Sequence, residues 1–233
     1  MSLINGNGPF GPERAGWASP ALPRGPIIYV EPHPRRITAV VGDRIVIDTE
    51  SALMVHRPGQ ALAYAFPADE VGELPHAAEP EAPGYVQVPW DAVDTWFEEG
   101  RRLMHYPPNP YHRVDCRPTR RRLHVEVEGT VLVDTDDTII LFETSLAPKL
   151  YVDPRHVRAD LLRRSSSTSW CNYKGAATWW SAEIDGTVID DVAWSYEDPL
   201  PESTQIRGFL SFEPDRVALS AALPAPATVP GPR

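Results

Sequence analysis

The feature that most constrains the fold of this chain is an internal repeat. When the sequence is shifted by 86 residues, the segment 35–55 (RRITAVVGDRIVIDTESALMV) aligns without a gap with the segment 121–141 (RRLHVEVEGTVLVDTDDTIIL). Five of the 21 positions are identical, and seven of the other 16 exchange Ile, Leu, Val and Met among themselves. The same shift aligns 66–71 with 152–157. A repeat of this length predicts one structural unit that is used twice.

Proline and glycine mark the ends of the two predicted units. The chain contains 26 prolines, which block helix interiors and central strands, and many of them cluster near the termini. Residues 1–26 are therefore expected to form an extended arm that either docks on a surface through Phe10 and Trp17 or moves freely. The other expected parts are a first, degenerate unit over 27–116, a second, complete unit over 117–220, and a disordered tail over 221–233.

Alternating apolar residues predict a mostly β protein with a few short helices. In the second unit, Glu128-Gly129 and Asp185-Gly186 are each typical of a tight turn between two strands. Asp153-Pro154 predicts the start of a short helix that reaches about Arg164. In the first unit, Asp91–Gly100 is expected to be helical. Strands are expected at 123–127, 131–133, 138–142, 177–184, 187–196, 209–212 and 217–219. A further strand is expected to end at Tyr151.

Composition excludes several classes of protein. Apolar residues make up 42% and charged residues 23% of the 233 residues, which is typical of a globular chain. No apolar run approaches the ~18 residues that a membrane span needs, and the N-terminus does not resemble a secretory signal. The net charge of −10 argues against nucleic-acid binding. Two cysteines cannot build a disulfide framework or a four-thiolate zinc site, so a cytoplasmic location is expected. The sequence leaves the oligomeric state open, a homo-oligomer included.

The segment Ser169–Gly175 (SWCNYKG) contains the candidate catalytic residues. Lys174 follows Cys171 by three residues, and a nearby ammonium group favours the thiolate form of a cysteine. Cys171 is therefore a candidate nucleophile with Lys174 as its activator. Alternatively, the segment is a tight loop in which Cys171 packs and Lys174 is solvated or paired with an acid. The run Leu161–Ser169, which contains four serines and Thr168, fits either a mobile loop over a site or a simple linker.

Aromatic residues are concentrated in the second unit, where four of the seven tryptophans lie within 25 residues. Because Trp179 and Trp180 point to opposite sides of a predicted strand, only one of them can face the core. The other is expected to line a pocket, contact the partner unit or lie exposed. Aromatic rings with polar neighbours form ligand cages, although most of these rings could equally be core. The cluster consists of Trp170, Tyr173, Trp179, Trp180, Trp194 and Tyr196.

Two further groups of residues invite a metal hypothesis. Asp134 and Asp136 could hold Mg²⁺ for phosphoryl transfer. However, the repeat places Asp48 and Glu50 at the same positions, and a polar turn explains both copies. The histidines around His112 show none of the standard ligand spacings. We therefore expect neither a bound metal nor a cofactor.

Three runs of residues resemble a known family. They are LFETSLAPKLYV (141–152), CNYKGAATWWS (171–181) and DVAWSYEDPLPES (191–203). In this order they resemble the bacterial domain of unknown function family 427 (DUF427), which carries the label of a nucleotidyltransferase domain. Residues 110–134 are similar to the junction in two-copy members of that family. The resemblance covers the second unit throughout, but the first only in its opening hairpins and helix.

The resemblance implies a β-tent fold, in which two antiparallel sheets meet at an angle. This fold is similar to that of the cereblon ligand-binding domain and of methionine sulfoxide reductase B. The chain lacks the zinc-binding cysteines of several relatives, and Asn172 and Trp179 replace a common proline and tyrosine. The recurrent family positions are Glu143, Tyr151, Cys171, Lys174, Trp194, Tyr196 and Glu197.

We therefore expect the second unit to bind an unidentified small molecule, with Lys174 contacting an anionic or carbonyl group. The expected site consists of Glu143, Tyr151, Lys174, Trp180, Trp194 and Tyr196. One alternative is an enzyme that uses Cys171 and Lys174. Another is a nucleotidyltransferase with Mg²⁺ and a nucleoside triphosphate near Asp134 or Asp136. A third is a scaffold that binds a partner protein through its arm.

Overall fold

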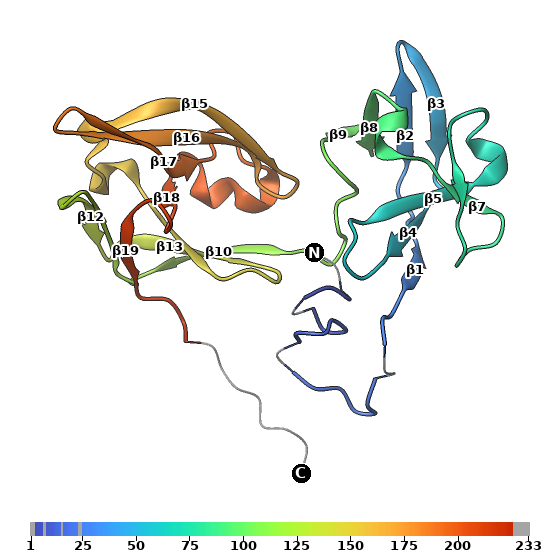
Figure 1. Cartoon of the computed structure of the whole chain (residues 1–233), viewed down its shortest axis with the longest axis horizontal. Helices are drawn as coiled ribbons and strands as arrows, with labels where there is room; N and C mark the ends of the chain where they lie inside the picture. Colours follow the sequence, from blue (N-terminus) through green and yellow to red (C-terminus); the bar gives the residue numbers. More distant parts are fainter. Residues whose placement is uncertain (1–2, 7, 15, 23–24, 226–233) are drawn as a thin grey trace. The chain divides into compact units, whose positions relative to one another are not determined.

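The computed structural model describes residues 3–6, 8–14, 16–22 and 25–225 (Figure 1). The chain divides into two compact units, unit 1 up to His112 and unit 2 from Arg113. Both are built from antiparallel strands with short 3₁₀ helices, which confirms the predicted mostly β fold. None of the helices in the described residues has the length and apolar character needed to span a bilayer.

Unit 1 contains a five-stranded sheet of order β1-β4-β5-β7-β6 and a four-stranded sheet of order β3-β2-β8-β9. Ile37, Met54 and Phe66 are fully buried in the core between strands of both sheets. The elements are β1 (Tyr29–Pro32), β2 (Ile37–Val41), β3 (Arg44–Thr49), β4 (Leu53–His56), β5 (Ala63–Pro67), η1 (Ala68–Glu70), β6 (Ala77–Ala78), β7 (Tyr85–Gln87), η2 (Trp90–Ala92), β8 (Thr95–Glu98) and β9 (Arg101–Leu103).

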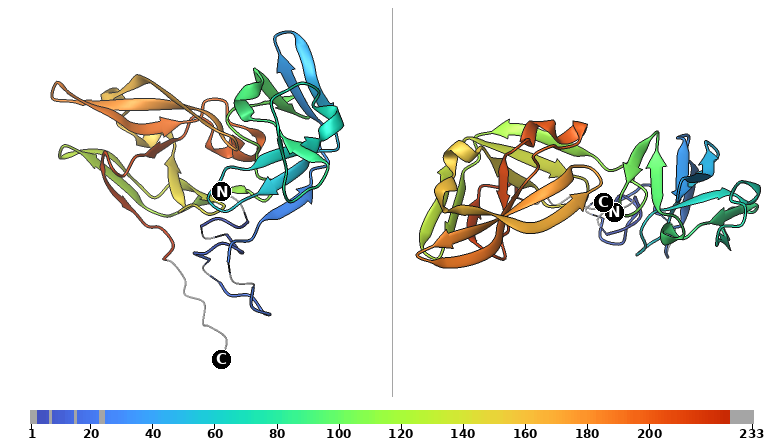
Figure 2. Two further views of the ribbon diagram at one scale, coloured as in Figure 1. Left: turned by 45° about the vertical axis from the view of Figure 1, so that its right-hand side comes forward. Right: turned by 90° about the horizontal axis from the view of Figure 1, so that it is seen from above.

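Unit 2 contains a seven-stranded sheet of order β10-β13-β14-β18-β17-β16-β15 and a three-stranded sheet of order β12-β11-β19. In Figures 1 and 2, β15, β16 and β17 run side by side as one layer, and β10, β12 and β13 lie in the other. The elements are β10 (Val114–Thr119), β11 (Leu123–Val127), β12 (Thr130–Thr135), β13 (Thr138–Glu143), β14 (Lys149–Val152), η3 (Pro154–His156), η4 (Ala159–Leu161), β15 (Leu162–Cys171), β16 (Gly175–Ile184), β17 (Thr187–Ser195), η5 (Pro201–Ile206), β18 (Leu210–Phe212) and β19 (Ala218–Ala221).

Strand alternation gives the seven-stranded sheet two apolar faces. Ile140 and Val152 belong to a large core that also contains side chains of the three-stranded sheet. Their neighbours Leu141 and Tyr151 belong to a second, smaller core. Successive residues of a strand point to opposite faces, so this second core lies on the other side of the sheet.

The two tight turns predicted in unit 2 are confirmed. Glu128 and Gly129 both have positive φ, 47° and 76°, and they join β11 to β12. Asp185 and Gly186, at 49° and 77°, join β16 to β17 in the same way. Two successive positive φ values are the conformation that suits the right-handed twist of a hairpin.

Three strand pairs of unit 2 repeat pairs of unit 1, with every partner 86 residues further along the chain. Thr38 pairs with Asp48 in β2–β3, as His124 pairs with Asp134 in β11–β12. A register shift interrupts both hairpins at the same place, after Ala39 and after Val125. The pairs β1–β4 and β4–β5 agree in register with β10–β13 and β13–β14 in the same way.

The strand beside this shared hairpin comes from different parts of the two units. Ile37 of β2 pairs with Glu98 of β8, whereas Leu123 of β11 pairs with Ala221 of β19. The chain reaches that strand through residues 68–94 in unit 1 and through the longer segment 153–217 in unit 2. Strands β15, β16 and β17 belong to this longer segment.

The helix predicted over Asp91–Gly100 is wrong. Only η2 is helical there, and Thr95–Glu98 is strand β8, hydrogen-bonded between β2 and β9. Trp96 is buried and its neighbour Phe97 is partly exposed, which is strand alternation. Backbone partners on both sides, distant in sequence, outweigh the local signals that favoured a helix.

The helix predicted to reach Arg164 is also wrong beyond its start. Asp153 does cap a helix, because its carboxylate accepts a 2.9 Å hydrogen bond from the Arg155 backbone N–H. This helix, η3, ends at His156, a second short 3₁₀ helix, η4, spans Ala159–Leu161, and strand β15 begins at Leu162. Ser165–Ser169 is therefore neither a loop nor a linker but part of an edge strand with mostly polar, outward side chains.

The N-terminal segment docks on unit 1, but not through the expected residues. Ile4 is 1% exposed, and Asn5 accepts a hydrogen bond from the Gly59 N–H at 2.8 Å and donates one to the Gln60 carbonyl at 3.3 Å. Phe10 and Trp17, the expected anchors, are 44% and 49% exposed.

The predicted disordered tail begins too early in the sequence. Ala221, its first residue, is the last residue of β19. The next residue, Ala222, donates a 3.0 Å backbone hydrogen bond to Arg122. Residues 226–233 of the predicted tail lie outside the described residues.

Candidate functional site

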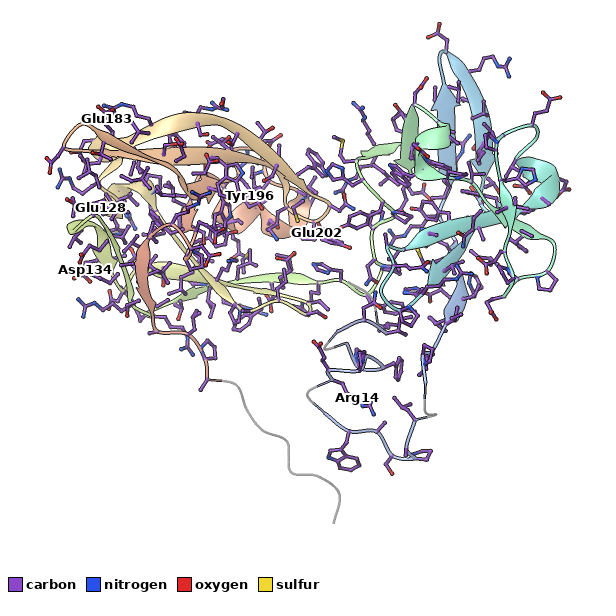
Figure 3. All side chains as sticks on the ribbon, in the orientation of Figure 1. Arg14, Glu128, Asp134, Glu183, Tyr196 and Glu202 are labelled. Carbon is purple, nitrogen blue, oxygen red and sulfur yellow. The ribbon has the colours of Figure 1, made fainter. Side chains whose placement is uncertain are left out.

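Unit 2 contains a cavity of about 300 Å³ on the side of the second core. Figure 3 shows Tyr196, one of its lining residues, inside unit 2, whereas Glu128 and Glu183 lie at hairpin ends. The lining residues are Leu141, Glu143, Leu146, Ala147, Lys149, Tyr151, Ser169, Cys171, Lys174, Trp179, Trp194, Tyr196 and Glu213.

Strand alternation explains how residues from five parts of the chain reach this cavity. The lining pairs Leu141 and Glu143, Lys149 and Tyr151, Ser169 and Cys171, and Trp194 and Tyr196 are each separated by one residue. Residues i and i+2 of a strand share a face, so each pair points to the same side. Strands β13, β14 and β15 and the end of β17, all in the seven-stranded sheet, thus supply most of the wall.

A buried ion pair lies in the cavity wall. The Lys174 ammonium group contacts the Glu143 carboxylate, and the two side chains are only 8% and 9% exposed. Lysine and glutamate are rarely buried unless they are paired, because removing either charge from water is costly. The pair therefore places one strong donor and one strong acceptor where a ligand of the cavity would meet them.

The backbone around Lys174 is held from outside the cavity. Lys174 is in the turn between β15 and β16, and its carbonyl accepts a 3.1 Å hydrogen bond from the Leu200 N–H. Gly175 has a φ of +97°, and a Cβ there would lie 3.4 Å from the Asp198 carbonyl oxygen. A residue with a side chain would be strained at this position, so the glycine fixes the end of the hairpin that carries Cys171 and Lys174.

Aromatic rings form the opposite part of the wall. Trp194 donates a 3.1 Å hydrogen bond from Nε1 to the Tyr151 hydroxyl, and the two rings meet edge to face at 6.5 Å. The Trp179 ring centroid lies 5.5 Å from that of Trp194, its cross-strand partner. Trp179 is itself held by a 3.0 Å hydrogen bond from Nε1 to Ser169. Such contacts fix ring orientations before a ligand arrives.

Burial keeps the two tyrosine hydroxyls of the cavity neutral. It raises the pKa of Tyr151 well above its usual value, although the hydrogen bond from Trp194 acts in the opposite direction. Burial also raises the pKa of Tyr196, and the neighbouring Tyr151 adds to this effect. A phenol that stays protonated can donate a hydrogen bond to a ligand.

A second lysine, Lys149, lines the same cavity. Its ammonium group lies over the Trp194 ring, 5.0 Å from the centroid, and it has no carboxylate partner among the described residues. Our sequence analysis did not select Lys149, although it lies in one of the runs that carry the family resemblance. A signal was available, because Lys149 and Lys174 are the only lysines in the chain.

The structure brings together most of the residues selected from the sequence. Glu143, Tyr151, Lys174, Trp194 and Tyr196 line the cavity, and so does Cys171. Trp180 does not line it. Trp180 packs against the large core on the other face of the sheet and donates a 2.9 Å hydrogen bond to Ser195. Trp179 has the position that we expected for Trp180.

The other candidates lie elsewhere. Both carboxylate oxygens of Asp134 accept hydrogen bonds from Arg122, each at 2.7 Å, and Asp48 and Arg36 make the same pair in unit 1 at 2.6 Å. The hydrogen bonds from Arg122 lower the pKa of Asp134. Cys116 is buried behind the cavity, and burial raises the pKa of its thiol. Within the described residues, no group of three or more His, Cys, Asp or Glu side chains could hold a metal ion.

The family model described as a domain of unknown function (DUF427) matches residues 115–222. Unit 2 is thus similar to the DUF427 family over almost its whole length. The matched residues include every residue that lines the cavity, so the candidate site lies entirely within the matched segment. No curated protein matches the chain.

Proposed function

We propose that unit 2 binds a small organic molecule in its cavity. The observation that carries this proposal is the combination of aromatic walls with a buried Lys174–Glu143 pair around a volume of about 300 Å³. Small-molecule sites are typically concave and mostly apolar, with a few fixed polar groups that orient the ligand. This cavity fits that description, because aromatic rings form much of its wall and the Lys174–Glu143 pair supplies fixed polar groups.

The ring contacts argue for a preformed site. Trp194, Tyr151 and Trp179 are held by hydrogen bonds to one another or to Ser169. A ligand would therefore lose little free energy in ordering the wall, and rigid sites bind more tightly for that reason. The tyrosine hydroxyls and the two lysines supply donors, and Glu143 supplies an acceptor.

Ligand-observed NMR with a library of small metabolites tests this proposal. Ala147→Trp at the exposed lining residue Ala147 would fill the cavity, whereas Val188→Trp places the same ring at an exposed hairpin position away from it. We expect library members to bind the wild type and V188W but not A147W. An absence of binding to the wild type, or equal binding to A147W, would contradict the proposal.

Two other functions have less support. An enzyme with Cys171 as nucleophile remains compatible with its place in the cavity wall. Nucleotide transfer, which the family label suggests, would require Asp134 or Asp136 as a metal ligand, yet Asp134 is already engaged by Arg122. Calorimetry with Mg²⁺ and a nucleoside triphosphate distinguishes that function, because heat of binding would favour it.

We also propose that the two units arose by duplication and that unit 1 is a structural copy without the site. The matching strand registers support this relation. In unit 1, Ala63 and Ala65 stand where unit 2 has Lys149 and Tyr151. The same library, tested against A147W, would reveal any binding that unit 1 retains.

A further inference from the structure

The placement of lysine in this chain is unusual. The chain has 22 lysines and arginines together, of which only Lys149 and Lys174 are lysines. Both line one cavity, and no arginine among the described residues lines it. The other lysine-or-arginine positions of the chain are all arginines. Both lysine side chains of the chain are thus found at the cavity.

Lysine and arginine side chains carry the same positive charge but differ in their chemistry. Arginine supplies a permanent cation and five donors, and it does not lose its proton in proteins. Lysine can lose its proton and then act as a nucleophile toward a carbonyl carbon, which is how lysines form imines. A cavity that needed only positive charge would be served by arginine as well.

Lys174 has a proton acceptor in direct contact. Its ammonium group touches the Glu143 carboxylate, and both groups are almost completely buried. A carboxylate in this position can take the ammonium proton as the amine attacks and can return it to a departing hydroxyl group. The contact therefore serves both proton transfers of imine formation.

We propose that Lys174 forms an imine with a small carbonyl compound bound in the cavity, an inference that rests on the proposed function. Glu143 takes a proton from the Lys174 ammonium group, and the amine lone pair attacks the carbonyl carbon, whose oxygen takes up a proton. The resulting carbinolamine loses its hydroxyl group as water. In total, one ammonium ion and one carbonyl give one protonated imine and one water, without oxidation or reduction.

Lys149 narrows the class of carbonyl compound. Its ammonium group lies over Trp194 without a carboxylate partner among the described residues, whereas the charge of Lys174 is balanced by Glu143. An anionic group on the ligand would balance the charge of Lys149 inside the cavity. The ligand class is therefore a small oxo acid, with a carbonyl at Lys174 and a carboxylate at Lys149.

Reductive trapping tests this proposal on the whole protein. Cyanoborohydride converts an imine to a stable secondary amine, which adds the mass of the probe less one oxygen. With glyoxylate as the probe, the chain offers three sites, which are Lys149, Lys174 and the terminal amine. We expect peptide mass spectrometry to show labelling at Lys174 at least about tenfold faster than at the other two.

Four variants separate the parts of the proposal. Lys174→Arg keeps the charge and should abolish labelling at this position. Glu143→Gln should slow labelling of Lys174 about tenfold or more. Lys149→Met should slow labelling of Lys174 by glyoxylate more than labelling by the uncharged probe propanal, and Lys149→Arg, which keeps the charge, should slow the glyoxylate reaction less than Lys149→Met does. Labelling that simply follows exposure, at the terminal amine and Lys149 but not at Lys174, would overturn the proposal.

Failure of this proposal and failure of the proposed function give different results. If library members bind the wild type but glyoxylate is not trapped at Lys174, the cavity binds ligands without forming an imine. If A147W is trapped as fast as the wild type, the reaction does not take place in the cavity. The wild-type and A147W results stand even if a Lys174 variant does not fold.

Discussion

Unit 1 and unit 2 share five strands and differ on one face of them. On the face toward the large core, Met54 and Phe66 of unit 1 stand where unit 2 has Ile140 and Val152, so both units remain apolar there. On the other face, Val55 and Ala65 stand where unit 2 has Leu141 and Tyr151. Side chains on one face of these strands thus form the hydrophobic core of each unit, whereas side chains on the other face can differ and form a site.

The strand beside the shared hairpin shows a second difference. Glu98 of β8 lies where unit 2 has Ala221, and it is buried in unit 1. Its carboxylate accepts hydrogen bonds from His33 at 2.9 Å and from Tyr64 at 2.7 Å, and it also contacts Arg35. Unit 1 thus has one of its buried charges between strands that form its core, whereas unit 2 has the Lys174–Glu143 pair in the cavity wall.

The largest expected effect on stability follows from removing the buried Glu98 carboxylate. Glu98→Ala leaves His33, Tyr64 and Arg35 without their shared acceptor, and removing one member of a buried charged network costs about 4 kcal/mol of unfolding free energy. Hydrogen exchange resolved by peptide should show faster exchange in unit 1 and little change in unit 2. Glu73→Gln, at an exposed position of unit 1, is the control, and equal acceleration in both units would contradict the comparison.

The next effect concerns the pair in the cavity wall. Lys174→Met leaves the Glu143 carboxylate buried without its partner, which should destabilise unit 2 by about 3 kcal/mol. The double variant Lys174→Met with Glu143→Leu should be more stable than the single variant, because an apolar pair has no charge to desolvate. Urea denaturation measures both. A double variant that is no more stable than the single one would mean that the pair contributes more than it costs.

A smaller effect should appear on acidification. Burial acts to raise the pKa of Glu98, but hydrogen bonds from His33, Tyr64 and Arg35 lower it to about 2. A lowered folded-state pKa stabilises the protein above the unfolded value of 4.5, and this stabilisation is lost as the pH falls toward 2. Unit 1 should therefore lose about 2 kcal/mol more than unit 2 over this range. Hydrogen exchange at pH 5 and pH 3 measures the difference, which Glu98→Gln should remove.

The smallest effect should be equal in the two units. Asp48→Asn and Asp134→Asn each remove the surface pair with the arginine that precedes the first strand of the hairpin. Exposed pairs contribute little, and salt screens them. Each variant should shift the urea midpoint less than the changes above, and the shift should shrink in high salt. A large effect in only one unit would show that the hairpins are not equivalent.

Local signals sufficed for hairpins whose turns and alternation agreed. Glu128-Gly129 and Asp185-Gly186 were predicted because the turn residues and the flanking strands indicate the same structure. The helix predicted from Asp91 failed because strand β8 depends on partners in β2 and β9 that no local window contains. Strand β15 was missed because an edge strand needs little apolar alternation.

The candidate site was predictable in its residue types but not in its geometry. The clustering of aromatic residues and the family resemblance selected Tyr151, Trp194 and Tyr196. The choice between Trp179 and Trp180 depends on which face of β16 each occupies, and register shifts next to Trp180 and in the β15–β16 pair disturb that relation. Lys149 could have been found by counting lysines, a signal that needs no structure.

The scarcity of lysine has a practical consequence for chemical labelling. Amine-reactive esters and crosslinkers modify lysines over the whole surface of most proteins. On this chain they have only the terminal amine, Lys149 and Lys174 to react with. Two of these three targets line the cavity, so a reagent that usually reports on surface exposure would here report on access to a single recess, and its rate of reaction would measure whether that recess is occupied.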